Sequence, residues 1–485
     1  MIINKKNFVN RDKQMELYGI KINGVSSDSR QIKDGYLFGA LDSEKATADA
    51  YIPSAVANGA KIVVCKPSYA DSQRYPDVKF ITDENPNLKF AQLAADFYGE
   101  QPNNICAVTG TNGKTSIADF VRQILTLMGE NAASIGTIGL IKGFNKPIPS
   151  ANTTPNAVVL AQELSELKKD GYDFAIMEMS SHGLCQYRVG GVKNVKVAGF
   201  TNLTRDHLDY HKTFENYLAA KEILFREILV EGGTAVLNAD IEVFERLNTL
   251  CLSTKKNVIS YGHNGKELKL IKSTPTLDGQ ILDILYFGEK KQINIPLAGE
   301  FQAMNVLCAL GMAALISGKR DEVLKYVSHI HGAKGRLDLA GKTPNGAAIY
   351  VDYAHTPDAL ENVLLAMRSH TKGKLHVLFG CGGDRDAGKR PIMGKIANDL
   401  ADVIYVTDDN PRTENAEKIR QQIMQACPRG KNIAGRAEAI AEAIKNLEKD
   451  DVLILAGKGH ETGQYINGVV YPFSDYDEVE KNLIK

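Results

Sequence analysis

The chain has 485 residues, of which 44% are hydrophobic and 24% are charged. These are ordinary values for a folded protein, so extensive disorder is excluded, and the length suggests about three domains. The 58 basic residues equal the 58 acidic residues, which makes the formal net charge zero. A nucleic-acid binder that relies on a basic surface is therefore disfavoured.

Seven cysteines are scattered along the chain, and even the closest two, Cys65 and Cys106, are far apart. This spacing excludes a C-x-x-C pair and a zinc ribbon, and scattered thiols are typical of a reducing compartment. The polar amino terminus lacks a signal-peptide core, and the apolar run 306–316 is shorter than the ~20 residues that cross a bilayer. We expect a soluble, cytoplasmic protein without membrane insertion.

The first part of the chain alternates short strand-like runs with helical patterns. Strands are expected at 36–40 and 61–65, a helix at 87–98, and a linker at 99–104, where the periodicity breaks. A strand at 105–109 then precedes a helix whose apolar face runs from Ile117 to Met128, with Gly129 placed as its C-terminal cap. Further strands are expected at the ranges 174–177, 195–200 and 234–238.

A second boundary is expected near residues 332–335, and a regular strand–helix series follows it. Its strands are predicted at the ranges 348–353, 375–379, 403–407 and 452–456. Such alternation is typical of α/β proteins with a parallel, doubly wound sheet, in which ligands bind at the carboxyl ends of strands. We predict three domains, at the ranges 1–101, 102–333 and 334–485.

A glycine-rich loop lies between the strand at 105–109 and the helix after it. Residues 109–116 read Thr-Gly-Thr-Asn-Gly-Lys-Thr-Ser, which would let backbone N–H groups and Lys114 bind phosphates and Thr115 bind Mg²⁺. Val108 stands where the full motif has its first glycine. The loop at 383–389 has the full spacing, but Arg390 replaces the metal-binding hydroxyl. We favour nucleotide binding at the first loop over a plain glycine turn.

Acidic residues and histidines follow other predicted strands. Glu178 ends the strand at 174–177, where it could be a second Mg²⁺ ligand or a structural hydrogen-bonding group. Residues 201–211 contain two histidines and two aspartates, which fit a metal site or a solvated polar loop equally well. Charged groups also close three strands near the carboxyl terminus, at the ranges 351–357, 407–412 and 455–461. Together they predict a pocket for a polar ligand.

Taken in order, these motifs resemble those of the Mur ligases, in particular the members that add the third residue of the peptidoglycan stem peptide. The likeness runs from about residue 24 to the end and also covers Asn152-Thr-Thr, Glu178-Met-Ser-Ser-His and Asp409-Asn-Pro-Arg. It implies an amino-terminal α/β uridine-nucleotide domain and a central P-loop ATPase domain with a mostly parallel sheet. A carboxyl-terminal Rossmann-like domain would bind the incoming amino acid.

The resemblance also implies a reaction. ATP phosphorylates the D-glutamate side-chain carboxylate of UDP-MurNAc-L-Ala-D-Glu, and an amine attacks the resulting acyl phosphate to form an amide. Lys114 and two Mg²⁺ ions supply positive charge, because phosphoryl transfer between anions depends on positioning and electrostatics. One ion is bound by Thr115 and Glu178, the other by Glu178, His207 and a carbamylated Lys221. Without the resemblance, Lys221 would be interpreted as a surface lysine of a helix.

Further site residues follow from the same likeness. The implied ATP contacts are Gly110, Thr111, Asn112, Gly113, Lys114, Thr115, Ser116, Asn305, Arg336 and Asp352. The implied UDP-MurNAc-dipeptide contacts are Ser27, Ser29, Glu44, Lys45, Ala46, Asn152, Thr153, Thr154, Ser180, Gln186 and Arg188. Around Glu44 to Ala46 the sequence departs from the family pattern, so only backbone contacts are expected there.

For the amino acid, the resemblance implies meso-diaminopimelate. The matching positions are Arg385, Asp409, Asn410, Pro411, Arg412, Gly457 and Glu461. Arg412 suits this substrate because a guanidinium can bind the distal carboxylate that L-lysine lacks. Three alternatives stay open: a lysine-adding Mur ligase, a folylpolyglutamate synthase and a non-catalytic nucleotide switch. We expect a monomer.

Overall fold

The computed structural model describes residues 15–42, 47–204, 206–276 and 279–484. The chain forms two compact units, which are treated separately below. The first unit comprises Met1–Ser260 and Cys308–Val323, and the second comprises Tyr261–Leu307 and Leu324–Lys485. The three-domain boundaries near residues 101 and 333 stay a prediction.

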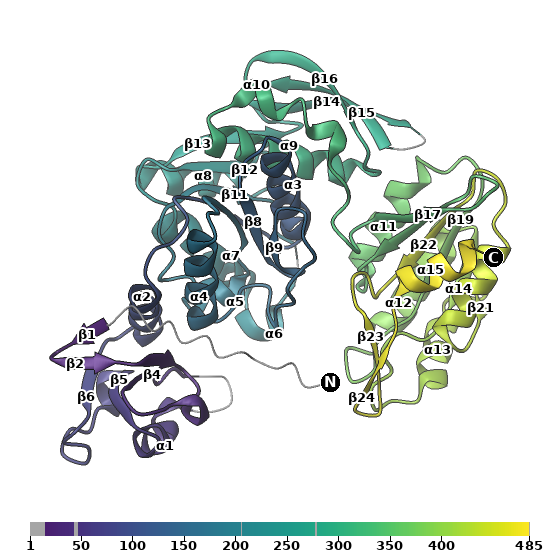
Figure 1. Ribbon diagram of the computed structural model, residues 1–485. Helices are drawn as coiled ribbons and strands as arrows, with labels where there is room; N and C mark the ends of the chain where they lie inside the picture. The colour runs from purple at the N-terminus through teal and green to yellow at the C-terminus, as the bar shows by residue number, and fades with distance from the viewer. Residues whose placement is uncertain (1–14, 43–46, 205, 277–278, 485) are drawn as a thin grey trace. The chain divides into compact units, whose positions relative to one another are not determined.

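The first unit begins with a small parallel sheet, which Figure 1 shows in purple. Its strands, in spatial order, are β3 (Gly24–Ser26), β4 (Tyr36–Gly39), β5 (Ala60–Cys65) and β6 (Lys79–Thr82). A hairpin of β1 (Met15–Leu17) and β2 (Ile20–Ile22) precedes it. Apolar residues of α1 (Ile52–Ala57) pack on one face and those of α2 (Pro86–Tyr98) on the other. The expected strands and helix of this region are confirmed.

A larger sheet forms the centre of the first unit. The strands of this sheet that lie wholly or mostly in the first unit are β7 (Asn104–Thr109), β8 (Ala132–Gly136), β9 (Gly139–Lys142), β10 (Phe174–Glu178), β11 (Val195–Phe200), β12 (Thr234–Asn238) and β13 (Asn257–Gly262). They lie in the order β13-β12-β11-β7-β10-β8-β9. The pairs from β12 to β8 are parallel, and only β9 is antiparallel to its neighbour β8. The strands β7, β10 and β11 therefore end side by side.

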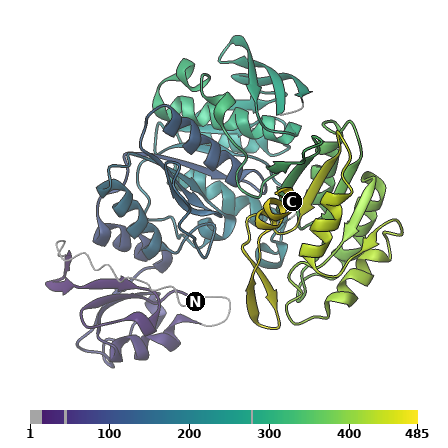
Figure 2. The same ribbon diagram turned by 45° about the vertical axis from the view of Figure 1, so that its right-hand side comes forward.

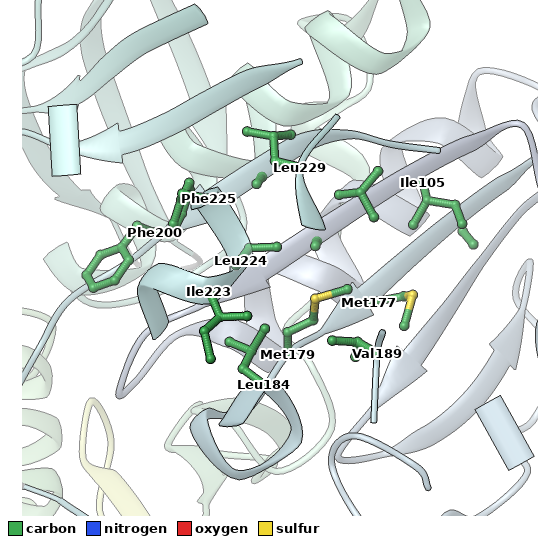
Figure 3. Packing of buried hydrophobic residues seen from close by; sticks show 14 of the residues in the cluster. Ile105, Met177, Met179, Leu184, Val189, Phe200, Ile223, Leu224, Phe225 and Leu229 are labelled. Atoms are coloured by element: carbon green, nitrogen blue, oxygen red, sulfur yellow. The ribbon is translucent and has the colours of Figure 1, made fainter. Parts of the chain in front are cut away.

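Helices bury the apolar faces of this sheet. They are α3 (Lys114–Leu127), α4 (Ala157–Lys169), α5 (Ser181–Cys185), α6 (Leu208–His211), α7 (Phe214–Ile223), which continues as a π-helical turn Leu224–Ile228, and α8 (Phe244–Ser253). Figure 3 shows part of the core, in which Met177 of β10, Leu184 of α5 and Ile223 of α7 belong to one buried apolar cluster. The predicted helix after residue 109 is confirmed, although it begins at Lys114, and Gly129 follows its end at φ +85°.

The segment that opens the second unit was not predicted from the sequence. It is an antiparallel meander of β14 (Leu268–Thr276), β15 (Gly279–Tyr286) and β16 (Glu289–Ile295). The helix α9 (Glu300–Ser317) follows and crosses the boundary between the units, and α10 (Arg320–Val323) comes after it. Among the described helices, α9 alone is long and apolar enough to span a membrane, but 67% of it is buried, as in a core helix.

A second α/β sheet forms the rest of this unit. Its strands are β17 (Asp338–Lys342), β18 (Ala348–Asp352), β19 (Leu375–Phe379), β20 (Val403–Val406), β21 (Lys431–Asn432) and β22 (Val452–Ala456), in the order β17-β18-β22-β19-β20-β21. The predicted parallel arrangement is confirmed for all of these strands except β17, which is antiparallel to β18. The four strands expected from the sequence are β18, β19, β20 and β22.

Helices cover both faces of this second sheet, as Figures 1 and 2 show. On one face lie α11 (Pro357–Arg368), α12 (Lys389–Leu400) and α13 (Ala416–Met424). On the other lie α14 (Arg436–Lys445) and α15 (Asp475–Leu483). A hairpin of β23 (Gly463–Ile466) and β24 (Val469–Pro472) follows β22. The expected mixed α/β fold class is confirmed.

Candidate active site

The glycine-rich loop joins β7 to the amino terminus of α3. Gly110 has φ +145°, and a Cβ there would collide with the hydroxyl of Thr201, so the loop needs glycine at this position. The segment after β11 holds the loop from outside, because Asn202 Oδ1 accepts the backbone N–H of Asn112 at 2.9 Å. Lys114 Nζ donates to the carbonyls of Gly110 and Thr111, both at 2.8 Å. This arrangement is typical of a phosphate-binding loop.

Glu178 lies directly beside this loop. Its carboxylate ends β10 and is buried, and its Oε2 accepts the hydroxyl hydrogen of Thr115 at 2.9 Å. Thr137, just after β8, donates its backbone N–H to Oε1 at 2.8 Å and its hydroxyl to Oε2 at 3.1 Å. The predicted pair of Thr115 and Glu178 is thus brought together by the parallel order of β7, β10 and β8. Thr137 was not predicted, because nothing near it in the sequence marks it.

A hydroxyl next to a carboxylate at a phosphate loop fits a hard divalent cation such as Mg²⁺. Within the described part of the chain, no three His, Cys, Asp or Glu side chains form a group that could bind a metal ion by themselves. Oxygen atoms from the loop and from a bound nucleotide would therefore have to complete such a site.

Lys221 is buried against the same loop. It lies on α7, is 1% exposed, and donates from Nζ to the carbonyl of Gly110 at 2.8 Å. Its ammonium also lies 4.4 Å from the ring centre of Tyr217. Burial, and secondly the positive charge of Lys114, lower the pKa of Lys221 well below its ordinary value. The interpretation of Lys221 as a surface lysine is therefore wrong.

His207 lies in the polar segment that follows β11. It precedes α6 in a left-handed conformation, with φ +53°, and its imidazole is about half exposed. Its ring centre lies 4.9 Å from that of His182 and 6.1 Å from that of Tyr217. The hydroxyl of Tyr217 in turn lies 3.1 Å from that of Thr111 in the loop. His207 is thus connected to the phosphate loop through Tyr217.

The first unit contains a cavity of about 1020 Å³. Four predicted substrate residues line it: Ser27, Asn152, Gln186 and Arg188. Ten other lining residues were not predicted: Leu41, Asp42, Asn87, Phe90, Asn156, Ala157, His182, Tyr187, Tyr210 and Lys212. The cavity draws its walls from segments far apart in sequence, so periodicity could not reveal them.

Three further predicted substrate residues, Thr153, Thr154 and Ser180, are linked to Glu178 by hydroxyl contacts. The hydroxyl of Thr153 is 3.0 Å from that of Thr137, and the Thr154 hydroxyl donates to the carbonyl of Glu178 at 3.0 Å and lies 3.1 Å from that of Ser180. Ser29 is buried, and its carbonyl accepts a hydrogen bond from Asn58. Glu44, Lys45 and Ala46 lie outside the described residues.

Three predicted nucleotide residues belong to the second unit. Asn305 donates to Gln302 Oε1 at 3.0 Å, and Gln302 donates to the carbonyl of Arg336 at 3.2 Å. The guanidinium of Arg336 stacks 5.0 Å from the ring centre of Tyr353. Asp352 is buried and accepts the backbone N–H of Leu337 at 2.6 Å. Burial, opposed by the charge of Arg336, raises the pKa of Asp352 to about 6.

The predicted amino-acid residues gather at the carboxyl ends of β20 and β22. Asn410 Nδ2 donates to Glu461 Oε2 at 2.9 Å. Gly457 has φ +112°, and a Cβ there would lie 2.7 Å from Asp409 Oδ2, so only glycine fits. Pro411 is buried, and Lys458 contacts both Asn410 and Glu461, a role that the motif did not reveal.

Two arginines border the same region. Arg412 adopts φ +51°, donates its backbone N–H to the carbonyl of Tyr465 at 2.9 Å, and donates from Nη1 to the carbonyl of Gly383 at 2.7 Å. Arg385 is exposed two residues further along that loop. The structure therefore brings six of the seven predicted residues into connected segments at this sheet edge, with Arg385 at its exposed rim.

A parallel sheet, a phosphate loop and an adjacent buried carboxylate define a phosphate-loop nucleotide-binding protein of the α/β class. Residues 108–313 match the Mur ligase middle domain, and residues 335–459 match the domain described as "Mur ligase, glutamate ligase domain". The chain belongs to the Mur ligase family.

Individual relatives agree with this. The UDP-N-acetylmuramoyl-L-alanyl-D-glutamate–2,6-diaminopimelate ligase of Agrobacterium fabrum is 45% identical over 468 residues, which cover 96% of this chain and 94% of the relative. A solved structure with the same description is 31% identical, with a TM-score of 0.73 and coverage of 96% and 95%. Mycobacterium tuberculosis folylpolyglutamate synthase, solved with ADP and AMPPCP, has a TM-score of 0.61, is 19% identical and covers 77% of this chain and 92% of its own, which shows a shared fold alone.

Proposed function

We propose that this chain is an ATP-dependent ligase of peptidoglycan synthesis. It joins meso-diaminopimelate to the D-glutamate side-chain carboxylate of UDP-MurNAc-L-Ala-D-Glu through an acyl phosphate. The observation that carries the proposal is the similarity over 96% of the chain to ligases described by that substrate pair. The phosphate loop and the polar strand ends of the second unit support it.

The first half-reaction transfers a phosphoryl group from ATP to a carboxylate. Both reactants are anions, so the protein has to position them and offset their repulsion. Lys114 and the backbone N–H groups at the start of α3 bind the phosphates. The carbonyls of Gly110 and Thr111 hold the ammonium of Lys114 at the loop.

Mur ligases use ATP and Mg²⁺. We assign Thr115 and Glu178 as protein ligands of one Mg²⁺, since their side-chain oxygens are 2.9 Å apart beside the loop. We further propose a second Mg²⁺ that is bound near Glu178, His207 and a carbamylated Lys221. Bound Mg²⁺ supplies positive charge to the phosphate oxygens.

Lys221 is proposed to be carbamylated. Its amine is buried beside a second cation, which favours the neutral form that carbon dioxide requires. Addition of CO₂ to the neutral amine forms a carbamate and releases one proton. A side chain that would repel metal ions as an ammonium thereby becomes an oxygen ligand.

Lys221→Ala should be nearly inactive, and a short carboxylic acid in the buffer should restore part of the activity. The check is turnover with and without the acid, together with the mass of the intact active protein. Crystallographic density that ends at a plain ammonium in the active, metal-bound protein would contradict carbamylation.

The uridine substrate is assigned to the cavity of about 1020 Å³ in the first unit. Arg188 lies at its wall, where Gln186 and the Thr154 carbonyl orient the guanidinium. Burial lowers the pKa of Arg188, so an anionic partner is favoured there. Such a partner exists in the carboxylates and phosphates of UDP-MurNAc-L-Ala-D-Glu.

Diaminopimelate is assigned to the polar carboxyl ends of β20 and β22 in the second unit. Its distal carbon carries an ammonium and a carboxylate, which match the carboxylate of Glu461 and the guanidinium of Arg412. L-Lysine lacks the distal carboxylate, so it would leave Arg412 without its partner.

One assay tests the proposed reaction. Phosphate release from ATP should require both UDP-MurNAc-L-Ala-D-Glu and meso-diaminopimelate, and should fall to background when either is left out. Release that depends on L-lysine instead would favour the lysine-adding alternative. Release with a folate and glutamate would favour a folylpolyglutamate synthase, and release that needs no acceptor would favour a nucleotide switch.

We place the protein in the cytoplasm as a monomer without membrane insertion. No disulfide joins any of the seven cysteines, which all lie in the described part of the chain, as expected in a reducing compartment. Light scattering coupled to size-exclusion chromatography tests the oligomeric state, and a mass near 53.0 kDa is expected.

A further inference from the structure

A fully buried cation, Lys458, lies among the residues that we assign to amino-acid binding at the carboxyl ends of β20 and β22. Lys458 follows Gly457 directly after β22, and its side chain is 0% exposed. Burying an ammonium is costly unless every donor is paired. The partners of Lys458 therefore indicate what this position contributes.

Three oxygens accept the hydrogens of Lys458 Nζ. They are Asn410 Oδ1 at 3.1 Å, Glu461 Oε2 at 3.1 Å and the carbonyl of Gly463 at 2.7 Å. An ammonium has three donors, so these contacts use all of them. Lys458 is consequently not placed to bind the substrate itself.

The same contacts set the orientation of Glu461. Its Oε2 accepts both Lys458 and Asn410 Nδ2, the latter at 2.9 Å. Within the described residues, Oε1 receives no hydrogen bond, and the side chain is 29% exposed. One oxygen of Glu461 is thus held by the protein, and the other is left for a ligand.

Asn410 is fixed in a similar way. Its Oδ1 accepts both Lys458 and the backbone N–H of Tyr465, each at 3.1 Å, so its amide nitrogen faces Glu461. Without Lys458, the amide could rotate and Glu461 would lose a charged partner.

We propose that Lys458 is a positioning residue for the incoming amino acid, because it fixes Asn410 and Glu461 so that Glu461 Oε1 meets the substrate's ammonium. The inference rests on the proposed function in that Asn410 and Glu461 bind this substrate. A purely structural lysine would instead support the fold and leave amino-acid affinity unchanged.

Lys458→Met separates these two roles, since it keeps the apolar stem and removes the charge. We expect KM for the amino acid to rise at least about tenfold, as for loss of a charged hydrogen bond. KM for ATP and for the uridine nucleotide should stay within twofold. Partial unfolding alone would lower the apparent kcat, because less of the enzyme is active, and would leave KM for each of the three substrates unchanged.

His376→Phe is the matched control. His376 and Asp451 form a pair whose side chains are each 2% exposed, at the opposite end of the same sheet. This variant should lower the melting temperature without changing KM for the amino acid. If Lys458→Met behaves in the same way as this control, Lys458 is structural and the proposal is wrong.

A double-mutant cycle tests whether Lys458 acts through Glu461. In a Glu461→Gln background, Lys458→Met should change KM for the amino acid by less than about threefold, because the carboxylate it orients is gone. If the two substitutions raise KM for the amino acid independently, so that their fold-changes multiply in the double variant, the proposal is wrong. Lys458→Gln, which keeps an amide donor, should give a smaller rise in KM and serves if the methionine variant does not fold.

The wild-type protein separates this inference from the proposed function. If it ligates no diaminopimelate, the proposed function fails, and the same KM comparison is made with whichever amino acid it uses. An unchanged KM for that amino acid in Lys458→Met would then count against Lys458 alone.

Discussion

Thr137 connects the buried carboxylate of Glu178 to Thr153. Its hydroxyl lies 3.1 Å from Glu178 Oε2 and 3.0 Å from the hydroxyl of Thr153. Its backbone N–H separately holds Oε1 of Glu178. A change in the position of Thr153 would therefore reach Glu178 through a single hydroxyl.

Thr137→Val should lower kcat/KM roughly tenfold or more, because it removes a hydrogen bond to a charged group worth about 1.5–3 kcal/mol. The backbone contact and the side-chain shape survive, so the fold should not change. The measurement is turnover as a function of Mg²⁺ concentration, with Thr137→Ser expected to restore most of the activity. Wild-type turnover and Mg²⁺ dependence in the valine variant would exclude this role.

Arg412 is the residue that we propose distinguishes diaminopimelate from L-lysine. Arg412→Ala should reduce use of diaminopimelate more than use of L-lysine, because only diaminopimelate presents a distal carboxylate. For the wild type, discrimination of at least about tenfold is expected from leaving a charged donor unpaired. Values of kcat/KM for both amino acids decide the matter. An equal fall in kcat/KM for diaminopimelate and for L-lysine would show that Arg412 does not bind the distal carboxylate.

At the scale of elements, α4 carries a partly buried acid, Glu163. Burial, and secondly the charge of Glu166, raise the pKa of Glu163 from 4.5 to about 7. Its Oε2 is buried and has no hydrogen-bond partner among the described residues. A carboxyl whose pKa is raised by folding binds its proton more tightly in the folded state. It therefore costs stability as the pH rises from 4.5 through 7, and the full cost applies above 7.

Glu163→Gln should raise the melting temperature at pH 8 by several degrees and leave it nearly unchanged at pH 4.5. A tenfold change in a protonation equilibrium is worth about 1.4 kcal/mol, so the gain at pH 8 is about 2–3 kcal/mol. Thermal unfolding of variant and wild type at both pH values is the check. An equal shift at both pH values would indicate that charge is not the cause.

Some strands could be predicted from their sequence, and others could not. The strands β7, β10, β11, β12, β18, β19, β20 and β22 were predicted, because buried parallel strands are continuous apolar runs between amphipathic helices. The strands β8, β9 and β21 were not predicted. The meander of β14 to β16 was missed. In β15 buried and partly exposed residues alternate, and β16 is rich in lysine, so neither contains a continuous apolar run.

At the scale of the whole molecule, the carboxyl-terminal sheet has its own core. Its two apolar clusters draw on residues 337–483, apart from Ala298. A fragment of residues 334–485 should therefore fold by itself, as expected of a domain. Circular dichroism and cooperative thermal unfolding of this fragment test the boundary near residue 333. A fragment without a cooperative transition would show that this sheet depends on the preceding segment.

The α/β class, the phosphate loop and the strand ends that carry polar residues could all be predicted from the amino-acid sequence. It could do so because these features depend on residues a few positions apart, as in the alternation of strand and helix or the spacing of Gly110, Gly113 and Lys114. Most of the residues predicted to bind the amino-acid substrate lie close together for a related reason. The carboxyl ends of parallel strands share one edge of the sheet.

Contacts between side chains far apart in the sequence could be found only from the tertiary structure. Lys221 was interpretable as a surface lysine until α7 placed its ammonium against Gly110, 111 positions away. Thr137 meets Glu178 because β8 pairs with β10, and Lys458 meets Asn410 because two strand ends share an edge. Burial, and the pKa of Lys221 that follows from it, depend on strand order and helix packing, which no local pattern specifies.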